Sequence, residues 1–112
     1  MIYELRTYHC MPGRLPDLLA RFKNLTLPLW ERHQIRQVGF WTVVVGDSNN
    51  DLVYILAWDS MAEREERWDK FATDPEWVRG RAATEENGQL VASVSNSLLR
   101  PTEFSAIQGW PA

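Results

Sequence analysis

Residues 2–10 read Ile-Tyr-Glu-Leu-Arg-Thr-Tyr-His-Cys, and this stretch decides the fold that we expect. It is rich in β-formers and is followed closely by the turn pair Pro12-Gly13, which predicts a strand inside a sheet. Because successive side chains of a strand point to opposite faces, the odd and even positions form two surfaces. The odd surface contains Tyr3, Leu5, Thr7 and His9, and the even surface contains Ile2, Glu4, Arg6, Tyr8 and Cys10.

A helical pattern follows this first strand. Apolar residues recur at i, i+3 and i+4 spacing from Leu15 to Leu29, and Pro16 lies in the first turn, where its missing N–H costs nothing. Pro28 lies inside the pattern. It cannot donate a hydrogen bond to the carbonyl of Asn24, so we expect a kink or break there.

The remaining elements predict one ferredoxin-like domain over residues 1–112. Strands are expected at 38–46 and 52–58, with a polar turn between them, and a last strand at 89–99. Ser60 with Glu63 forms a capping box that opens a helix, and Asp74-Pro75 opens a second, shorter one. This second helix should bury Trp77, Val78, Ala82 and Ala83. The resulting β-α-β-β-α-β order is typical of an α+β fold, with an antiparallel sheet that carries its helices on one face and has its first and third strands in the middle.

Both faces of the predicted sheet are apolar. In the third strand, Leu52, Tyr54, Leu56 and Trp58 alternate with Val53, Ile55 and Ala57, and Trp41, Val43 and Val45 oppose Phe40 and Val44 in the second. The helices can cover only one face, and large exposed apolar patches are rare in soluble monomers. We therefore expect a homodimer that packs sheet against sheet. One alternative is a monomer whose twisted sheet stays partly exposed. The other is that one strand is misread and its second face lies under the C-terminal tail.

Composition excludes several classes of partner and cofactor. The net charge of −3 gives no basic surface for nucleic acid or anionic membranes, and no apolar run is long enough to span a bilayer. The single cysteine, Cys10, excludes an internal disulfide, and with no signal-peptide pattern it favours the cytoplasm. The two histidines, His9 and His33, do not have the spacing of metal ligands. No phosphate loop or dinucleotide fingerprint occurs, so we expect neither a metal nor another cofactor.

The best candidate site is a pocket between sheet and helices. If the odd surface of the first strand faces the helices, Thr7 and His9 would converge there with His33, Trp68 and Trp77. A histidine in such a pocket is a candidate general base, because its pKa lies near neutrality. The alternative is that both histidines only satisfy hydrogen bonds at the end of the core and that the tryptophans only pack. Glu4 and Arg6, if buried, need ion-pair partners either within the subunit or across the dimer.

Several segments resemble NIPSNAP domains. These are Tyr3-Glu4-Leu5-Arg6-Thr7-Tyr8 before Pro12-Gly13, the region of Pro28, Gly39-Phe40-Trp41, Arg67-Trp68-Asp69-Lys70-Phe71 before Asp74-Pro75-Glu76-Trp77, and residues 97–105. The resemblance covers nearly the whole chain and implies the dimeric α+β barrel fold. Relatives that share this fold include cofactor-independent monooxygenases, haem-degrading enzymes, and small-molecule cyclases or isomerases.

Two functions are compatible with this sequence. The first is a cofactor-independent, monooxygenase- or isomerase-like enzyme that acts on a small hydrophobic or aromatic molecule in the sheet–helix pocket. The second is a non-catalytic homodimeric module that binds a ligand or another protein. A closed cavity with His9 or His33 beside unpaired polar groups favours the enzyme, and a core filled by Trp68, Trp77 and Phe71 favours the module.

Overall fold

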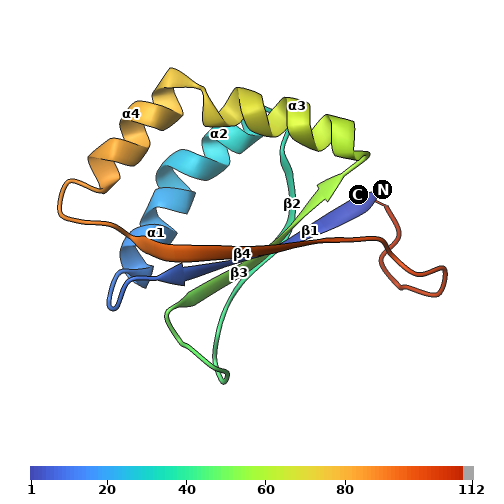
Figure 1. The fold of residues 1–112 in the computed structure, drawn as a ribbon, viewed down its shortest axis with the longest axis horizontal. Coiled ribbons are helices and arrows are strands. Elements are labelled where there is room, and N and C mark those ends of the chain that lie inside the picture. Colours follow the sequence, from blue (N-terminus) through green and yellow to red (C-terminus); the bar gives the residue numbers. More distant parts are fainter. Residues whose placement is uncertain (110–112) are drawn as a thin grey trace.

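The computed structural model of the chain describes residues 1–109 and has the expected order of elements (Figure 1). The four strands form one antiparallel sheet in the order β2-β3-β1-β4, which confirms the prediction that the first and third strands are central. The elements are β1 (Ile2–Cys10), α1 (Leu15–Arg21), the π-helical turn η1 (Phe22–Thr26), α2 (Leu27–Arg32), β2 (Arg36–Thr42), β3 (Asp51–Trp58), α3 (Met61–Ala72), α4 (Pro75–Thr84) and β4 (Val91–Leu99).

The helices all lie on one side of the sheet (Figure 1). In the register of β1 with β3, Arg6 pairs with Tyr54 and Tyr8 pairs with Leu52. Tyr54 and Leu52 are fully buried core residues, so the even positions of β1 face the helices. The odd positions face the other way. We call this second surface the distal face. Its described residues include Leu5, Thr7, His9, Val53, Ile55 and Trp41.

The first helical segment is irregular near Pro28, as the sequence predicts. The backbone N–H of Leu27 donates to the carbonyl of Phe22, five residues earlier, and residues 22–26 form a π-helical turn. Pro28 follows at once and has no N–H to contribute. A π turn places residues five apart on the same helical face, which an α-helix does not do. The three segments α1, η1 and α2 therefore form one continuous helix whose exposed and buried faces shift at the π turn.

The second and third helical elements begin where their caps predict. Ser60 accepts a hydrogen bond from the N–H of Glu63, and Asp74 accepts one from the N–H of Glu76. Of the expected buried side of α4, Trp77 is partly buried against the core. The prediction is wrong for the other three residues, because Val78 is 53% exposed and Ala82 and Ala83 are exposed as well. This helix instead approaches the first one closely at Gly80, where a Cβ would lie 2.7 Å from the Leu25 side chain.

The second strand is shorter than predicted. Its last paired residue is Thr42, which lies opposite Leu52 of β3. Val44 and Val45 are about 95% exposed in the loop beyond it. These valines fit a strand by propensity, but the strand opposite them begins only at Asp51. Without a partner strand they have no ladder to join.

The C-terminal segment covers only one end of the distal face. The hydroxyl of Tyr3 donates to the carbonyl of Gly109, and Tyr3 is buried. Leu99, which pairs with Tyr3, is nevertheless 44% exposed, and Trp41 on the edge strand β2 is 49% exposed. The alternative in which the tail shields the second face therefore applies to Tyr3, while Leu5 and Ile55 at the centre of the distal face are only partly buried in a single copy.

Candidate functional site

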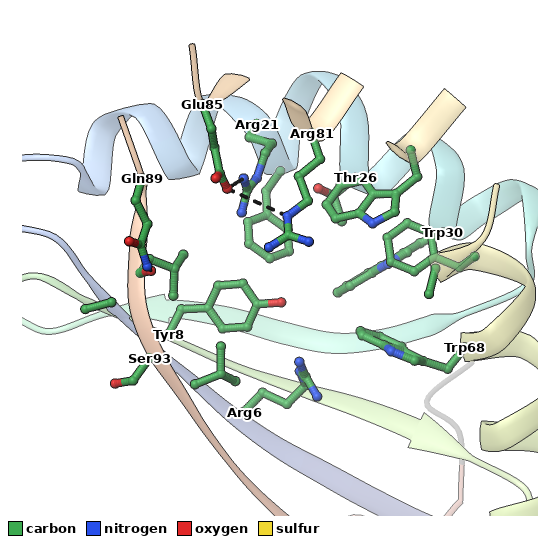
Figure 2. Close-up of a pocket in the computed structure, with 17 residues that line it drawn as sticks. Arg6, Tyr8, Arg21, Thr26, Trp30, Trp68, Arg81, Glu85, Gln89 and Ser93 are labelled. Carbon is green, nitrogen blue, oxygen red and sulfur yellow. Dashed lines mark hydrogen bonds and ion pairs between the residues drawn. The ribbon is translucent and has the colours of Figure 1, made fainter. Parts of the chain in front are cut away.

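A cavity of about 520 Å³ lies between the sheet and the helices (Figure 2). This volume is within the range of small-molecule sites in proteins. Strands β1 and β4 form one wall, the first helix forms a second, and α3 and α4 contribute the rest. Its polar lining residues are Arg6, Tyr8, Arg21, Thr26, Arg81, Glu85, Gln89 and Ser93, and its aromatic ones include Trp30, Trp68, Phe71 and Trp77.

A buried carboxylate holds the arginine on the sheet side of this cavity. Glu4 is fully buried and accepts two hydrogen bonds from Arg64, at 2.8 Å from Nε and 3.0 Å from Nη2. It also accepts one from Nη1 of Arg6 at 3.0 Å. Trp58 Nε1 and Asn96 Nδ2 each donate a further bond at 3.0 Å. The ion pair that the sequence left open therefore forms within one subunit, and α3 supplies the second arginine.

These contacts set the charges of the network. Burial raises the pKa of Glu4, but the hydrogen bonds from Arg64 and Asn96 and the charge of Arg6 outweigh it and lower this pKa from 4.5 to about 2. Burial also opposes the charge on Arg6. Tyr54, Tyr8 and Glu4 stabilise that charge and keep the pKa of Arg6 above its ordinary value. Both groups are therefore ionised at neutral pH.

Arg6 is held in position as well as charged. Its Nε donates to the Tyr54 hydroxyl at 2.7 Å, and its guanidinium carbon lies 4.7 Å from the centre of the Trp68 ring. Cation–π contact of this kind stabilises a planar guanidinium against an indole. In Figure 2, Arg6 and Tyr8 project from β1 into the cavity.

The helix side of the cavity carries buried polar atoms without partners. Arg21, Thr26 and Trp30 are 6%, 2% and 1% exposed, and within residues 1–109 no partner exists for Arg21 Nε, Thr26 Oγ1 or Trp30 Nε1. Another nitrogen of the same guanidinium group, Nη1 of Arg21, donates to Glu85 at 3.0 Å. Most buried polar groups in proteins are hydrogen-bonded, so three without partners around one cavity call for an explanation.

The sequence model of the NIPSNAP family matches residues 3–106, nearly the entire chain. The chain belongs to the NIPSNAP family. This confirms the resemblance found in the sequence.

Relatives of this NIPSNAP chain support the same assignment. Protein NipSnap homolog 3B of Mus musculus is 35% identical over 75 residues, which are 67% of this chain and 30% of that protein. The match thus spans less than a third of the length of this curated relative. A NIPSNAP family protein with unknown function, Atu4242 from Agrobacterium tumefaciens, has a TM-score of 0.84 and 27% identity over 96% of this chain and 94% of its own.

A more distant likeness concerns the fold alone. An antibiotic biosynthesis monooxygenase has a TM-score of 0.59 and 13% identity, covering 91% of this chain and 99% of that one. The predicted α+β fold is therefore that of NIPSNAP proteins and monooxygenase-like dimeric α+β barrel proteins. Neither comparison establishes an activity for the NIPSNAP chain.

The structure brings only part of the predicted site into the cavity. Trp68 and Trp77 line it, as expected. Thr7 and His9 do not, because the odd positions of β1 belong to the distal face. Alternation along the strand fixed which residues share a face. It could not tell which face meets the helices, since both are apolar. The placement of Thr7 and His9 in the pocket is therefore wrong.

His33 also lies outside this cavity. Its Nε2 is 2.7 Å from Oδ2 of Asp74, and it faces a separate shallow depression beside α3. The hydrogen bond with His33 is the main cause of a lowered pKa at Asp74. This pair fastens the end of α2 to the start of α4, which is the structural alternative considered for this residue.

His9 takes part in a different arrangement on the distal face. Its Nδ1 is 3.0 Å from Oδ1 of Asp51, and its Nε2 is 3.0 Å from Oγ of Ser95. The three side chains come from β1, β3 and β4, which are adjacent in the sheet. The order carboxylate, imidazole, hydroxyl is that of Ser-His-Asp hydrolases.

Sequence reasoning missed the arginines of the cavity. Arg6 carries a signal, because a charged residue beside Glu4 on an otherwise apolar strand surface indicates a buried polar network. Arg21 and Thr26 carry none in isolation, since their place depends on the π turn. Within residues 1–109, no cluster of three histidine, cysteine or acidic residues could hold a metal ion, and no helix is long and apolar enough to cross a membrane.

Proposed function

We propose that this NIPSNAP chain is a homodimeric enzyme that acts, without a cofactor, on a small aromatic or apolar molecule held in the sheet–helix cavity. The observation that carries the proposal is the cavity itself. It keeps about 520 Å³ of space although Trp30, Trp68, Phe71 and Trp77 line it. A site that served only as core would be filled by these rings.

Tyr8 is our candidate for proton transfer in that cavity. It projects toward the space beside Arg6, and hydroxyl groups in such a position can give or take a proton during a reaction. Glu85 is less suited to this task, because it is already paired with Arg21 at 3.0 Å. The enzyme therefore needs both the cavity and Tyr8, whereas a module that only binds a ligand needs the cavity without Tyr8.

The homodimer would cover the distal face of each copy. Trp41 and Leu99 are about half exposed there, and Leu5 and Ile55 are only partly buried. Packing two such faces together removes this apolar surface from water. The free, buried thiol of Cys10 is consistent with a reducing compartment, and we propose the cytoplasm.

Obstructing the cavity should abolish ligand binding and leave the fold intact. Ala72 lies at the end of α3, where it lines the cavity and is exposed, so Ala72→Phe adds a ring at the rim of the opening. We expect aromatic and apolar small molecules to raise the melting temperature of the wild type and to leave that of this variant unchanged. Tyr8→Phe should still bind but lose turnover, measured as product formation by mass spectrometry.

Ala83→Phe is the matched control, since Ala83 is exposed on α4 and does not line the cavity. It should bind as the wild type does. Equal binding by Ala72→Phe would contradict the proposed site. Full turnover by Tyr8→Phe would remove Tyr8 from the mechanism.

A second candidate function rests on the hydrogen bonds Asp51–His9–Ser95 on the distal face. In this function Oγ of Ser95 would attack an ester carbonyl, His9 would take the hydroxyl proton and then protonate the leaving alcohol, and Asp51 would stabilise the imidazolium. Water would then release the acid from the serine ester. This candidate competes with the first, because the proposed homodimer covers the same face.

Active-site labelling separates the two functions. The second candidate predicts that a fluorophosphonate phosphonylates Ser95 with loss of fluoride, and that labelling falls at least about a hundredfold in His9→Ala. Ser97→Ala, on the same face of β4, serves as the control and should label normally. Absence of phosphonylated Ser95 in the wild type, read by peptide mass spectrometry, would eliminate the second candidate.

A further inference from the structure

We infer that the ligand of the sheet–helix cavity is a small aromatic or apolar carboxylic acid, and that Arg21, Thr26 and Trp30 bind its carboxylate. This inference rests on the proposed function and adds the chemical class of the ligand. It starts from the three unpartnered polar atoms on the helix side, Arg21 Nε, Thr26 Oγ1 and Trp30 Nε1.

The π turn explains why these three residues share a face. Thr26 follows Arg21 by five residues across η1, and Trp30 follows Thr26 by four residues within α2. Residues five apart lie above one another in a π turn, as residues four apart do in an α-helix. All three side chains therefore descend from one helix toward the cavity (Figure 2). In an uninterrupted α-helix Arg21 would point elsewhere.

Burial makes the missing partners informative. The three side chains are at least nine-tenths buried, so they have little contact with bulk water. A buried donor without an acceptor lowers the stability of the folded state. Short helical irregularities of this kind are frequent at functional sites. A ligand that accepts hydrogen bonds from these atoms would remove this loss of stability.

The chemistry of the donors defines the group that fits. A guanidinium N–H and an indole N–H can only donate, and the threonine hydroxyl can donate as well. Three arginines line the cavity. Arg21 and Arg81 share Glu85, at 3.0 and 3.7 Å. Arg6 shares Glu4 with Arg64. A surplus of positive charge therefore remains here, although the chain as a whole has a net charge of −3. A carboxylate has acceptor sites for three donors and the charge that complements this surplus.

The rest of the cavity suits an aromatic or apolar body. Trp68 stacks under Arg6, and Phe71 and Trp77 lie with ring centres 4.6 Å apart. Such walls favour flat apolar groups over a polar sugar or a polyphosphate, whose further oxygens would face rings. Arg21 also lies 5.7 Å from the Trp77 ring centre, so the anchor and the aromatic wall are contiguous.

A matched pair of probes tests the inference on the full chain. Calorimetry would compare 2-naphthoate with 2-naphthalenemethanol, which has a similar body and no charge. We expect the acid to bind about tenfold or more tightly than the alcohol, because hydrogen bonds to a charged group are the stronger ones. Arg21→Met should reduce this preference to about one, since it removes the charge and keeps much of the volume.

Thr26→Val gives a second reading that does not depend on Arg21 and its bond to Glu85. Loss of an unpartnered buried hydroxyl should leave the melting temperature of the free protein unchanged or higher, while the acid binds several-fold more weakly. A merely structural threonine would show the opposite change in melting temperature and none in affinity. Arg79→Met, at an exposed arginine of α4 outside the cavity, should change nothing.

Two outcomes would overturn the inference in distinguishable ways. Equal affinity for the acid and the alcohol in the wild type, both lost in Ala72→Phe, would reject the carboxylate and keep the proposed cavity. Failure of both probes to bind at millimolar concentration would reject the carboxylate and the proposed function together.

Discussion

Replacing Glu4 with glutamine lowers the free energy of unfolding by about 3–5 kcal/mol, the usual cost of removing one partner from a buried ion pair. Arg6 and Arg64 both donate to this carboxylate, and the variant leaves two cations without their shared anion. Small domains are stable by about 5–15 kcal/mol, so the variant should be close to unfolded at elevated temperature. Urea unfolding at neutral pH measures the change.

The same carboxylate predicts how stability depends on pH. Its pKa is about 2 in the folded chain against an ordinary 4.5, so the folded state binds fewer protons than the unfolded state between these values. This contribution of about 3 kcal/mol is complete above about pH 5 and is lost as pH falls through 4.5 toward 2. The unfolding free energy of the wild type should therefore fall more steeply in this window than that of Glu4→Gln.

Glu66→Gln is the matched control for both measurements. Glu66 is 67% exposed and pairs with Lys70 on the helix surface, so its loss should change stability by less than about 0.5 kcal/mol. Parallel pH curves for the wild type and Glu4→Gln would show that this carboxylate does not carry the acid sensitivity.

Placing a charge at Ile55 should dissociate the proposed homodimer. Ile55 pairs with Leu5 on one side and Gly39 on the other, so it lies at the centre of the distal face. In Ile55→Asp, two-fold symmetry would bury two aspartate side chains in one interface. Each buried charge would weaken association by several kcal/mol. We expect the dissociation constant to rise about a thousandfold or more, measured by sedimentation equilibrium.

Val78→Asp is the control for this experiment. Val78 is 53% exposed on α4, which lies on the opposite side of the sheet, and its charge should leave association unchanged. If Ile55→Asp dimerised as tightly as the wild type while Val78→Asp did not, the helical side would be the contact surface.

Much of the fold follows from sequence patterns that act locally. The order of the strands, the caps at Ser60 and Asp74, and the disturbance near Pro28 depend on short-range rules, and the structure agrees with them. The apolar character of both sheet faces could also be predicted from the sequence, because it requires only the alternation of side chains along Leu52–Trp58.

The errors in predicting which residues of β1 line the cavity have one physical origin. Alternation separates the residues of β1 into two sets and gives no information on which set meets the helices. The pocket predicted from the sequence contains Thr7 and His9 on the condition that the odd surface of β1 faces the helices, and that condition is not met. The polar set, which contains Glu4, is inside instead, because Arg64 from α3 and Asn96 from β4 satisfy the carboxylate. Partners so far apart along the chain cannot be identified from a single sequence.

The position of Arg21 in the cavity could not be predicted from the sequence, and the reason is related. Pro28 indicates an irregular helix but does not say whether it kinks, breaks or widens. Only the π turn brings Arg21 onto the same face as Thr26 and Trp30. A shift of one residue in the helical repeat thus decides which side chains line the cavity.

Native mass spectrometry of the purified full chain tests the central claim most directly, because it reads association and bound ligand together. We expect a species of twice the 13.0 kDa chain mass that carries an additional small mass, lost on denaturation and absent from Ala72→Phe. A single-copy species at micromolar concentration, or the same bound mass in Ala72→Phe, would contradict it.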